Sequence, residues 1–148
     1  RYRQFMLFAQ GNAYISYGNE RLRFRINNDA SASYAGTTLM AIHAADSSST
    51  PYWTKAYSYN TVLMDFVPYI ISETMPLSIC AQFTPLGRHV QTQIQISNKM
   101  VTGLSFGSYW LAEGAEFSSI EMILHNFSGS RNVELNEIVL LGLEKGSA

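Results

Sequence analysis

The stretch RLRFRI, residues 21–26, alternates strictly between arginines and apolar side chains. Because successive side chains of an extended strand point to opposite faces, this period of two places the three guanidinium groups on one face and the apolar groups on the other. The segment is therefore predicted to be a β-strand with one buried face. The stretch HVQTQIQI, residues 89–96, repeats the pattern with glutamines on its polar face. No window of similar length has apolar residues at helical spacing.

Further candidate strands follow at short spacing, separated by Gly, Asn, Asp and Pro residues that favour turns. The predicted strands are Tyr2–Ala9, Ala13–Tyr17, Glu20–Asn27, Thr37–Ala44, Thr61–Val67, Leu77–Phe83, His89–Ser97, Gly103–Trp110, Ser118–His125 and Val133–Leu143. The only helical candidate is Trp110–Phe117, which Gly114 interrupts. About eight to ten short strands without helical crossovers predict an all-β protein with little helix, an antiparallel β-sandwich of the jelly-roll type.

The length of 148 residues suits one domain with its own hydrophobic core, so we expect a single β-sandwich over residues 1–148. The start at Arg1, without a methionine, indicates the C-terminal part of a longer chain. The single cysteine, Cys80, cannot form an intrachain disulfide and lies in an apolar run, where we expect a buried and inert thiol.

The chain carries unusually little charge. Charged residues make up 14% of it, against about 25% in an average soluble domain. Either copies of the chain cover much of its exterior, or Ser, Thr, Asn and Gln keep that exterior polar. The net charge of −1 provides no strong positive field for nucleic acid, and no apolar stretch is long enough to span a bilayer. We therefore predict neither nucleic-acid binding nor membrane insertion.

The two charge types concentrate at opposite ends of the sequence. Arginines cluster in the first 25 residues and glutamates after residue 112. One hypothesis is that the first long strand pairs near the last one, so that arginines and glutamates meet across strands or across a subunit boundary. The alternative is that these charges are solvated without partners.

No catalytic or metal-binding constellation is evident, so we predict no enzyme activity, cofactor or metal ligand. The histidines, His43, His89 and His125, lack a second ligand at metal-site spacing. The stretch GLSFG, residues 103–107, matches Gly-x-Ser-x-Gly, but that motif requires a strand-to-helix elbow and these surroundings are all-β. Asp65 interrupts an apolar run and is interpreted as an outward position of an alternating strand.

Aromatic residues beside turns form the candidate binding site. Their rings stack on the C–H faces of sugars, while neighbouring amides and carboxylates bind hydroxyls. The candidate ligand-binding residues are Tyr52, Trp53, Tyr57, Tyr59, Tyr109 and Trp110. The alternative is that the tryptophans close the ends of the sandwich core. The glutamine row Gln91, Gln93 and Gln95 either lines such a site or forms a hydrated strand face.

Two resemblances bear on function. The segments IEMILHN at 120–126 and GSRNVELNEIVL at 129–140 resemble the final hairpin of jelly-roll carbohydrate-binding domains. The whole chain is also similar to the C-terminal knobs of bacteriophage tail fibres, tail spikes and tail needles. The shared features are the low charge, the lack of disulfides, a polar surface rich in Gln, Ser, Thr and Asn, and the fragment-like start.

The second resemblance implies a non-enzymatic attachment domain that binds a cell-surface glycan of the host at the tip of a phage tail appendage. It also implies a homotrimer, located on the virion and assembled in the host cytoplasm. One alternative is a secreted carbohydrate-binding module of a polysaccharide-degrading enzyme. Another is a structural trimerisation or decoration knob without a ligand.

Overall fold

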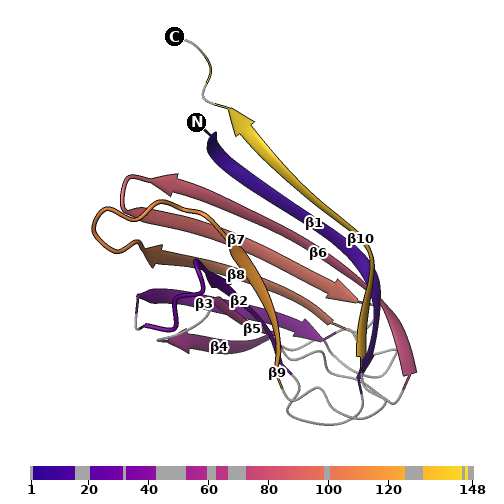
Figure 1. Cartoon of the computed structure of the whole chain (residues 1–148). Helices are drawn as coiled ribbons and strands as arrows, with labels where there is room; N and C mark the ends of the chain where they lie inside the picture. Colours follow the sequence, from indigo (N-terminus) through magenta and orange to yellow (C-terminus); the bar gives the residue numbers. More distant parts are fainter. Residues whose placement is uncertain are drawn as a thin grey trace.

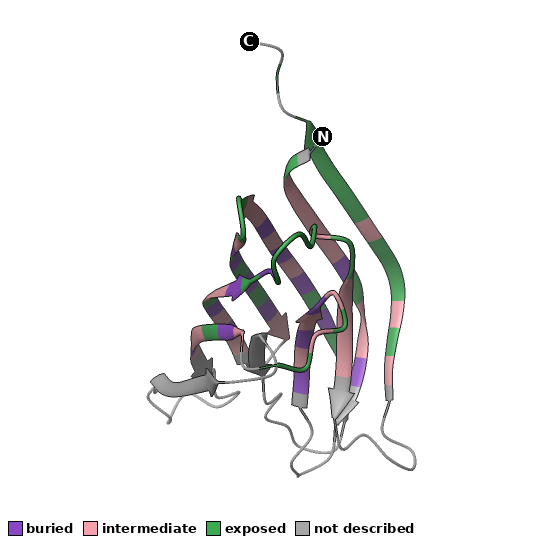
Figure 2. Cartoon of the chain, turned by 60° about the vertical axis from the view of Figure 1, so that its left-hand side comes forward, coloured by how far each residue is buried: buried purple, intermediate pink, exposed green. Residues whose placement is uncertain are grey.

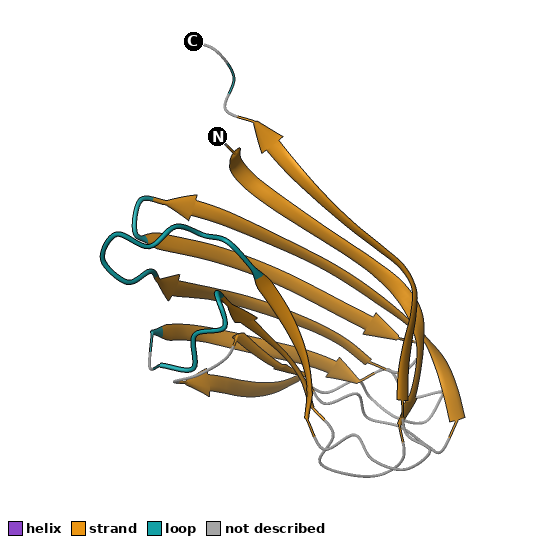
Figure 3. Ribbon diagram, viewed as in Figure 1, coloured by secondary structure: helices purple, strands orange, loops and turns teal. Residues whose placement is uncertain are grey.

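The computed structural model describes residues 2–15, 21–31, 33–42, 53–59, 63–66, 73–98, 101–125, 132–144 and 146. Within these residues the protein is an all-β, antiparallel β-sandwich without a helix (Figure 3). The predicted fold class is therefore confirmed. None of the described segments forms a helix with the length and hydrophobicity needed to cross a membrane.

Ten strands are described. They are β1 (Tyr2–Ile15), β2 (Arg21–Ile26), β3 (Tyr34–Ile42), β4 (Trp53–Tyr59), β5 (Leu63–Phe66), β6 (Glu73–Leu86), β7 (His89–Asn98), β8 (Val101–Trp110), β9 (Ile120–His125) and β10 (Asn132–Glu144).

The strands form two sheets of unequal size (Figure 1). The large sheet has the order β10-β1-β6-β7-β8-β3-β4, and the small sheet has the order β5-β2-β9. Strands β6, β7 and β8 follow one another in the chain and lie side by side as a meander. This order does not establish the jelly-roll connection that we expected.

The core lies between the two sheets, as the period of two predicted. In β2, Leu22, Phe24 and Ile26 are buried, whereas Arg23 and Arg25 are half-buried. In β7, burial alternates in the same way, with the glutamines exposed. We call the face of the large sheet that carries the buried residues its inner face and the opposite face its outer face. The inner face contributes Leu77, Ile79, Ala81, Phe83, Val90, Ile94 and Ile96 to the core (Figure 2).

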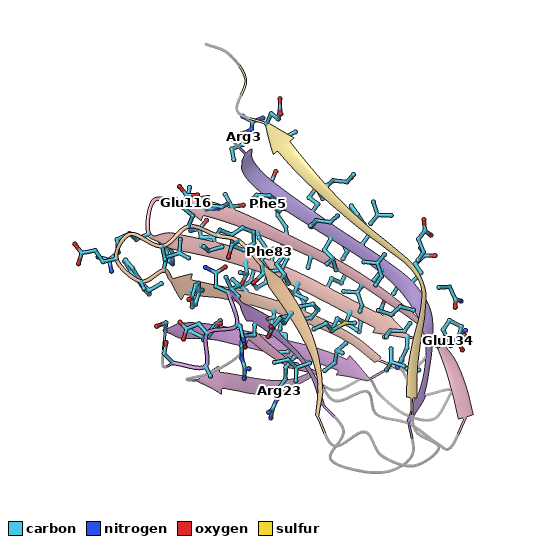
Figure 4. The ribbon with its side chains drawn as sticks, in the orientation of Figure 1. Arg3, Phe5, Arg23, Phe83, Glu116 and Glu134 are labelled. Carbon is cyan, nitrogen blue, oxygen red and sulfur yellow. The ribbon has the colours of Figure 1, made fainter. Side chains whose placement is uncertain are left out.

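The loop of residues 111–119 closes one part of the core. Its Phe117 ring lies 4.9 Å from the ring of Phe5 and 5.9 Å from that of Phe83, measured between centroids. Figure 4 labels Phe5 and Phe83 on neighbouring strands of the large sheet. The predicted helical turn at Trp110–Phe117 is wrong: β8 continues through Trp110, and a loop follows because it has to cross from the large sheet to the small one.

Two further boundaries differ from the prediction. Gly11 and Asn12 do not form a turn, because β1 continues through them to Ile15. The strand instead has a β-bulge there: Gln10 lies opposite Glu137 and Gly11 opposite Leu135, which leaves Asn136 as the extra residue of β10. Strand β4 was not predicted as a strand, because its Tyr-rich sequence was assigned only to a binding site.

Cys80 is half-buried, since it lies at an outward position of β6 between the buried Ile79 and Ala81. The expected burial of this thiol is therefore wrong. The apolar run around Cys80 indicates a strand, but the run alone does not decide which residues face the core.

The first strand of the chain, β1, does pair with the last one, β10, and the register places Tyr2 opposite Glu144. The strand that carries Arg21, Arg23 and Arg25, β2, belongs to the other sheet. Strand β2 pairs with β9, and this register places Arg25 directly opposite Glu121. An arginine and a glutamate therefore do lie on neighbouring strands, but the acid comes from β9. Opposite charges at facing positions of adjacent strands favour that register over one that opposes like charges.

Candidate functional site

A groove of about 630 Å³ lies over β3, β6, β7 and β8, mostly on the outer face of the large sheet. Gly36 and Gly107 are among the residues that line it. The polar side chains of the outer face that line it are Thr37, Gln82, Thr84, His89, Gln91, Gln93 and Ser108, and Phe106 is its aromatic side chain. The buried Thr92 also borders it. We call this set, together with Ala35, Gly36 and Gly107, the outer groove. No Asp, Glu, Lys or Arg lines it among the described residues.

Two exposed aromatic rings belong to this surface. Phe106 is 50% exposed, and Trp110, four residues further along β8, is 58% exposed. Four residues of an extended strand span about 13 Å, and their even separation places both rings on the same face. The Trp110 ring also stacks on His89 of the outer groove, with 5.1 Å between ring centroids. The rings thus provide two apolar contact points within one polar surface.

Backbone hydrogen bonds fix the end of β8 that carries Trp110. The N–H of Trp110 donates to the carbonyl of Ser33 at 3.0 Å, and the N–H of Leu111 donates to the carbonyl of Arg88 at 2.8 Å. These two bonds attach the backbone at Trp110 to segments on both sides of β8, which fixes the direction in which the side chain leaves the strand. The Trp110 ring is therefore positioned on a rigid element and not on a free loop.

The residue before Trp110 anchors the same strand end in the core. The Tyr109 hydroxyl donates to the Asp29 carboxylate at 2.7 Å, and the Tyr109 ring stacks on Tyr34, with 4.6 Å between centroids. The Tyr34 hydroxyl in turn accepts from the N–H of Ile26 at 3.0 Å and donates to the carbonyl of Asp29 at 2.8 Å. The two tyrosines therefore tie the β2–β3 connection to β8.

Ionisation in this cluster follows from burial and hydrogen bonding. Burial raises the pKa of Tyr34 to about 12, and burial together with the bond to Asp29 raises the pKa of Tyr109 further. Burial acts to raise the pKa of Asp29 as well, but hydrogen bonds from Tyr109 and Ser31 outweigh it and hold that pKa below its ordinary value. At neutral pH the Asp29 carboxylate is thus ionised and accepts hydrogen bonds from the neutral groups of Tyr109 and Ser31.

A second set of bonds joins the β2–β3 turn to the loop of residues 111–119. Asn27 and Asn28 both have left-handed backbone, with φ of 54° and 53°. The Asn27 carbonyl oxygen Oδ1 accepts from the N–H groups of Ser118 and Ser119 at 2.8 and 3.1 Å, and Nδ2 donates to the carbonyl of Glu116 at 2.7 Å. The side chain of Asn27 therefore holds the loop that covers Phe5 and Phe83.

We expect Asn27→Gly to lower the free energy of unfolding by about 1–2 kcal/mol, because glycine keeps the left-handed backbone but loses the four side-chain bonds to the loop, the fourth being from the Ser118 hydroxyl. Asn28→Gly is the matched control, since Asn28 has the same φ and is exposed. Its effect should lie within about 0.5 kcal/mol of zero. Urea denaturation of both variants measures the difference. Equal losses would mean that the turn backbone, and not the Asn27 side chain, determines the stability.

The predicted site residues fall into three groups. Trp110 is exposed beside the outer groove, as a ligand-stacking role requires. Tyr109 is only 2% exposed, because it alternates with Trp110 on β8 and faces the core, where it has the structural role described above. A ligand contact of Tyr109 stays a prediction.

The remaining candidates come from β4 and the segment before it. Tyr52 and the side chains of Trp53, Tyr57 and Tyr59 lie outside the described residues. The backbone of β4 nevertheless places Tyr57 opposite Thr37 and Tyr59 opposite Ala35, two residues of the outer groove. The register therefore brings part of the predicted aromatic segment to the edge of this groove.

Sequence reasoning missed several residues of the outer groove, among them Phe106, His89 and Gln82. Phe106 was considered only as part of the GLSFG motif. Its position four residues before Trp110 was the available signal, because equal parity on one strand means a shared face. Gln91 and Gln93 were named as a possible lining, and both line the groove; Gln95 lies on the same face of β7 but outside it.

The structure also bears on the catalytic motif and the metal ligands that the sequence analysis considered. Ser105 is buried in the middle of β8, so the GLSFG segment forms no nucleophile elbow there. No group of three or more His, Cys, Asp or Glu side chains that suits a metal ion occurs in the described part of the chain. The side chains of His43, Asp65 and His125 lie outside that part.

Comparisons with known protein families, with curated proteins and with solved structures found no match to this chain. The fold defines it as an antiparallel β-sandwich with an uncharged groove on one sheet. The geometry of that groove is therefore the feature that indicates a function.

Proposed function

We propose that this protein is a non-enzymatic attachment domain that binds a neutral cell-surface glycan in the outer groove. The observation that carries the proposal is the combination of two exposed rings, Phe106 and Trp110, with a groove lined by amides and hydroxyls. Rings stack on the C–H faces of sugars, and amide groups both donate to and accept from sugar hydroxyls.

The lining also selects the class of glycan. Sugars that carry carboxylate, sulfate or phosphate groups are usually bound through arginine or lysine, which form charge-assisted hydrogen bonds. Neither residue type lines the described groove. Neutral sugars satisfy the amides and hydroxyls without leaving a buried charge unpaired. The separation of about 13 Å along β8 between the two aromatic positions suits a chain of several sugar units better than a single ring.

The resemblance in sequence extends this proposal to a phage tail appendage that contacts its host, with the protein located on the virion. An attachment domain needs specific binding and no chemistry, which agrees with the character of the outer groove. The same groove also suits a secreted carbohydrate-binding module. The two contexts differ in the glycan that is bound, so the identity of the best ligand distinguishes them.

A glycan array probed with the wild type and with Trp110→Ala tests the proposal. We expect a signal for neutral oligosaccharides that Trp110→Ala weakens by at least about tenfold, since loss of a central aromatic contact typically costs 1.5 kcal/mol or more. The melting temperature should change little, because the ring is mostly exposed.

The glutamine row provides a matched pair for titration of the best oligosaccharide. Gln93 lines the outer groove, whereas Gln95 lies on the same face of the same strand outside it. Gln93→Ala should weaken binding by roughly three- to tenfold, the value of one hydrogen bond, and Gln95→Ala should leave the affinity unchanged. The absence of any glycan signal for the folded wild type, or equal losses in both variants, would refute binding in this groove.

A further inference from the structure

Strand β10 forms an unprotected edge of the large sheet. Among the described strands it pairs only with β1, and its register with β1 is unbroken from Glu137 to Leu143. Proteins normally protect such edges with charged residues, proline or bulges. The stretch Ile138–Leu143 contains no charged residue or proline, and the bulge lies before it. Its outward backbone groups therefore form a template for another strand.

Both faces of this edge are apolar. Ile138 lies opposite the buried Ala9 and thus belongs to the inner face, together with Leu140. These two side chains are 61% and 57% exposed, and Leu141 on the outer face is 52% exposed. Figure 2 shows β10 exposed along most of its length. A contiguous apolar surface of this kind is typical of a protein–protein interface.

We propose that β10 pairs antiparallel with β10 of a second copy of this chain, about a two-fold axis at Leu140, so that the two large sheets become one. The stretch Glu137–Leu143 is centred on Leu140, and pairing about that residue is self-complementary. It places Leu140 opposite Leu140 of the partner subunit, and Val139 opposite the partner's Leu141. The partner covers both apolar faces of the edge with an identical edge.

The length of the paired ladder favours this register over its neighbours. The Glu137 side chains of the two copies lie at opposite ends of the seven-residue ladder, about 20 Å apart, so they do not repel each other strongly. Within the unbroken stretch, an axis at Val139 shortens the ladder to residues 137–141, and an axis at Leu141 shortens it to residues 139–143. Only the axis at Leu140 pairs all seven residues, with Glu137 opposite the partner's Leu143.

This pairing has a consequence that rests on the proposed glycan function, although the pairing itself does not. A two-fold axis perpendicular to the sheet keeps the outer faces of both copies on the same side. The dimer then presents two outer grooves to one surface, which increases attachment through multivalency. The resemblance to phage knobs implied a homotrimer. An edge strand that pairs with the same strand of another copy instead forms a closed dimer, because each copy has then used its only β10 edge.

Sedimentation equilibrium on the wild type should yield twice the chain mass of 16.6 kDa. Leu140→Glu and Leu140→Lys each place like charges opposite one another at the axis, and each should raise the dimer dissociation constant by about 100-fold. Mixing the two variants should restore the dimer, because the charges then attract. Phe106→Glu, which changes an exposed apolar side chain far from β10, should remain a dimer.

Circular dichroism first establishes that each variant is folded, as the exposure of Leu140 leads us to expect. Amide hydrogen exchange on the wild type is a second readout that needs no variant: exchange of residues 138–143 should slow as the protein concentration rises. A monomeric or trimeric wild type, a dimer that Leu140→Glu does not weaken, or mixed variants that stay apart would overturn the pairing. A dimer without a glycan signal would refute only the proposed function.

Discussion

Phe24→Ala is expected to lower the free energy of unfolding by about 3–5 kcal/mol, the largest effect of any single substitution considered for this protein. Phe24 has no exposed surface and lies on β2, the central strand of the small sheet, with Leu63 on one side and Met122 on the other. Its ring belongs to the same buried cluster as Phe83 of the large sheet. Removing the ring leaves a cavity between the sheets that the surrounding strands fill only in part.

A loss of this size is a large fraction of the 5–15 kcal/mol that stabilises a typical domain. Chemical denaturation followed by tryptophan fluorescence measures it. Phe106→Ala removes the same atoms from a half-exposed side chain, so its loss should be about 1 kcal/mol or less. If both variants lost equal stability, the packing of the small sheet against the large one would not be the main source of stability.

Gly11→Ala should destabilise the protein by about 3 kcal/mol, at the upper end of the cost of overpacking. A Cβ at Gly11 would collide with the backbone carbonyl oxygen of Glu134 and would lie 2.8 Å from the Cα of Leu135. These atoms belong to β10 at the bulge, where backbone cannot move aside as a flexible side chain does. The pairing of β1 with β10 has to open locally.

Gly146→Ala is the control for this substitution, because an added Cβ at Gly146 meets nothing within 4 Å. Its melting temperature should equal that of the wild type. Hydrogen exchange provides the local readout: in Gly11→Ala, the amides of β1 and β10 near the bulge should exchange faster than those of β7. A variant of Gly11 as stable as the control would contradict the tight approach of the two strands.

Much of the candidate site follows from the sequence once the strands are known. Trp110 was predicted, and the parity of Gln91 and Gln93 placed them on one face. The sequence offered no means of placing Gln82 of β6 and Thr37 of β3 beside them, because the contacts among these strands are long-range. The burial of Tyr109 was also missed, since neighbouring aromatic residues of a strand cannot be assigned to the buried or the exposed face until one face is known to be covered.

The sequence by itself determined that this is an all-β protein and which residues of each strand share a face, because the two faces of a pleated strand follow from the local backbone. Only the tertiary structure decided which faces are covered. Strand β2 lies beneath the large sheet and buries one face, whereas the apolar residues of β10 remain exposed on both. The physical reason is that burial depends on which distant segments lie against a strand. That choice is made by packing over the whole chain and not by local periodicity.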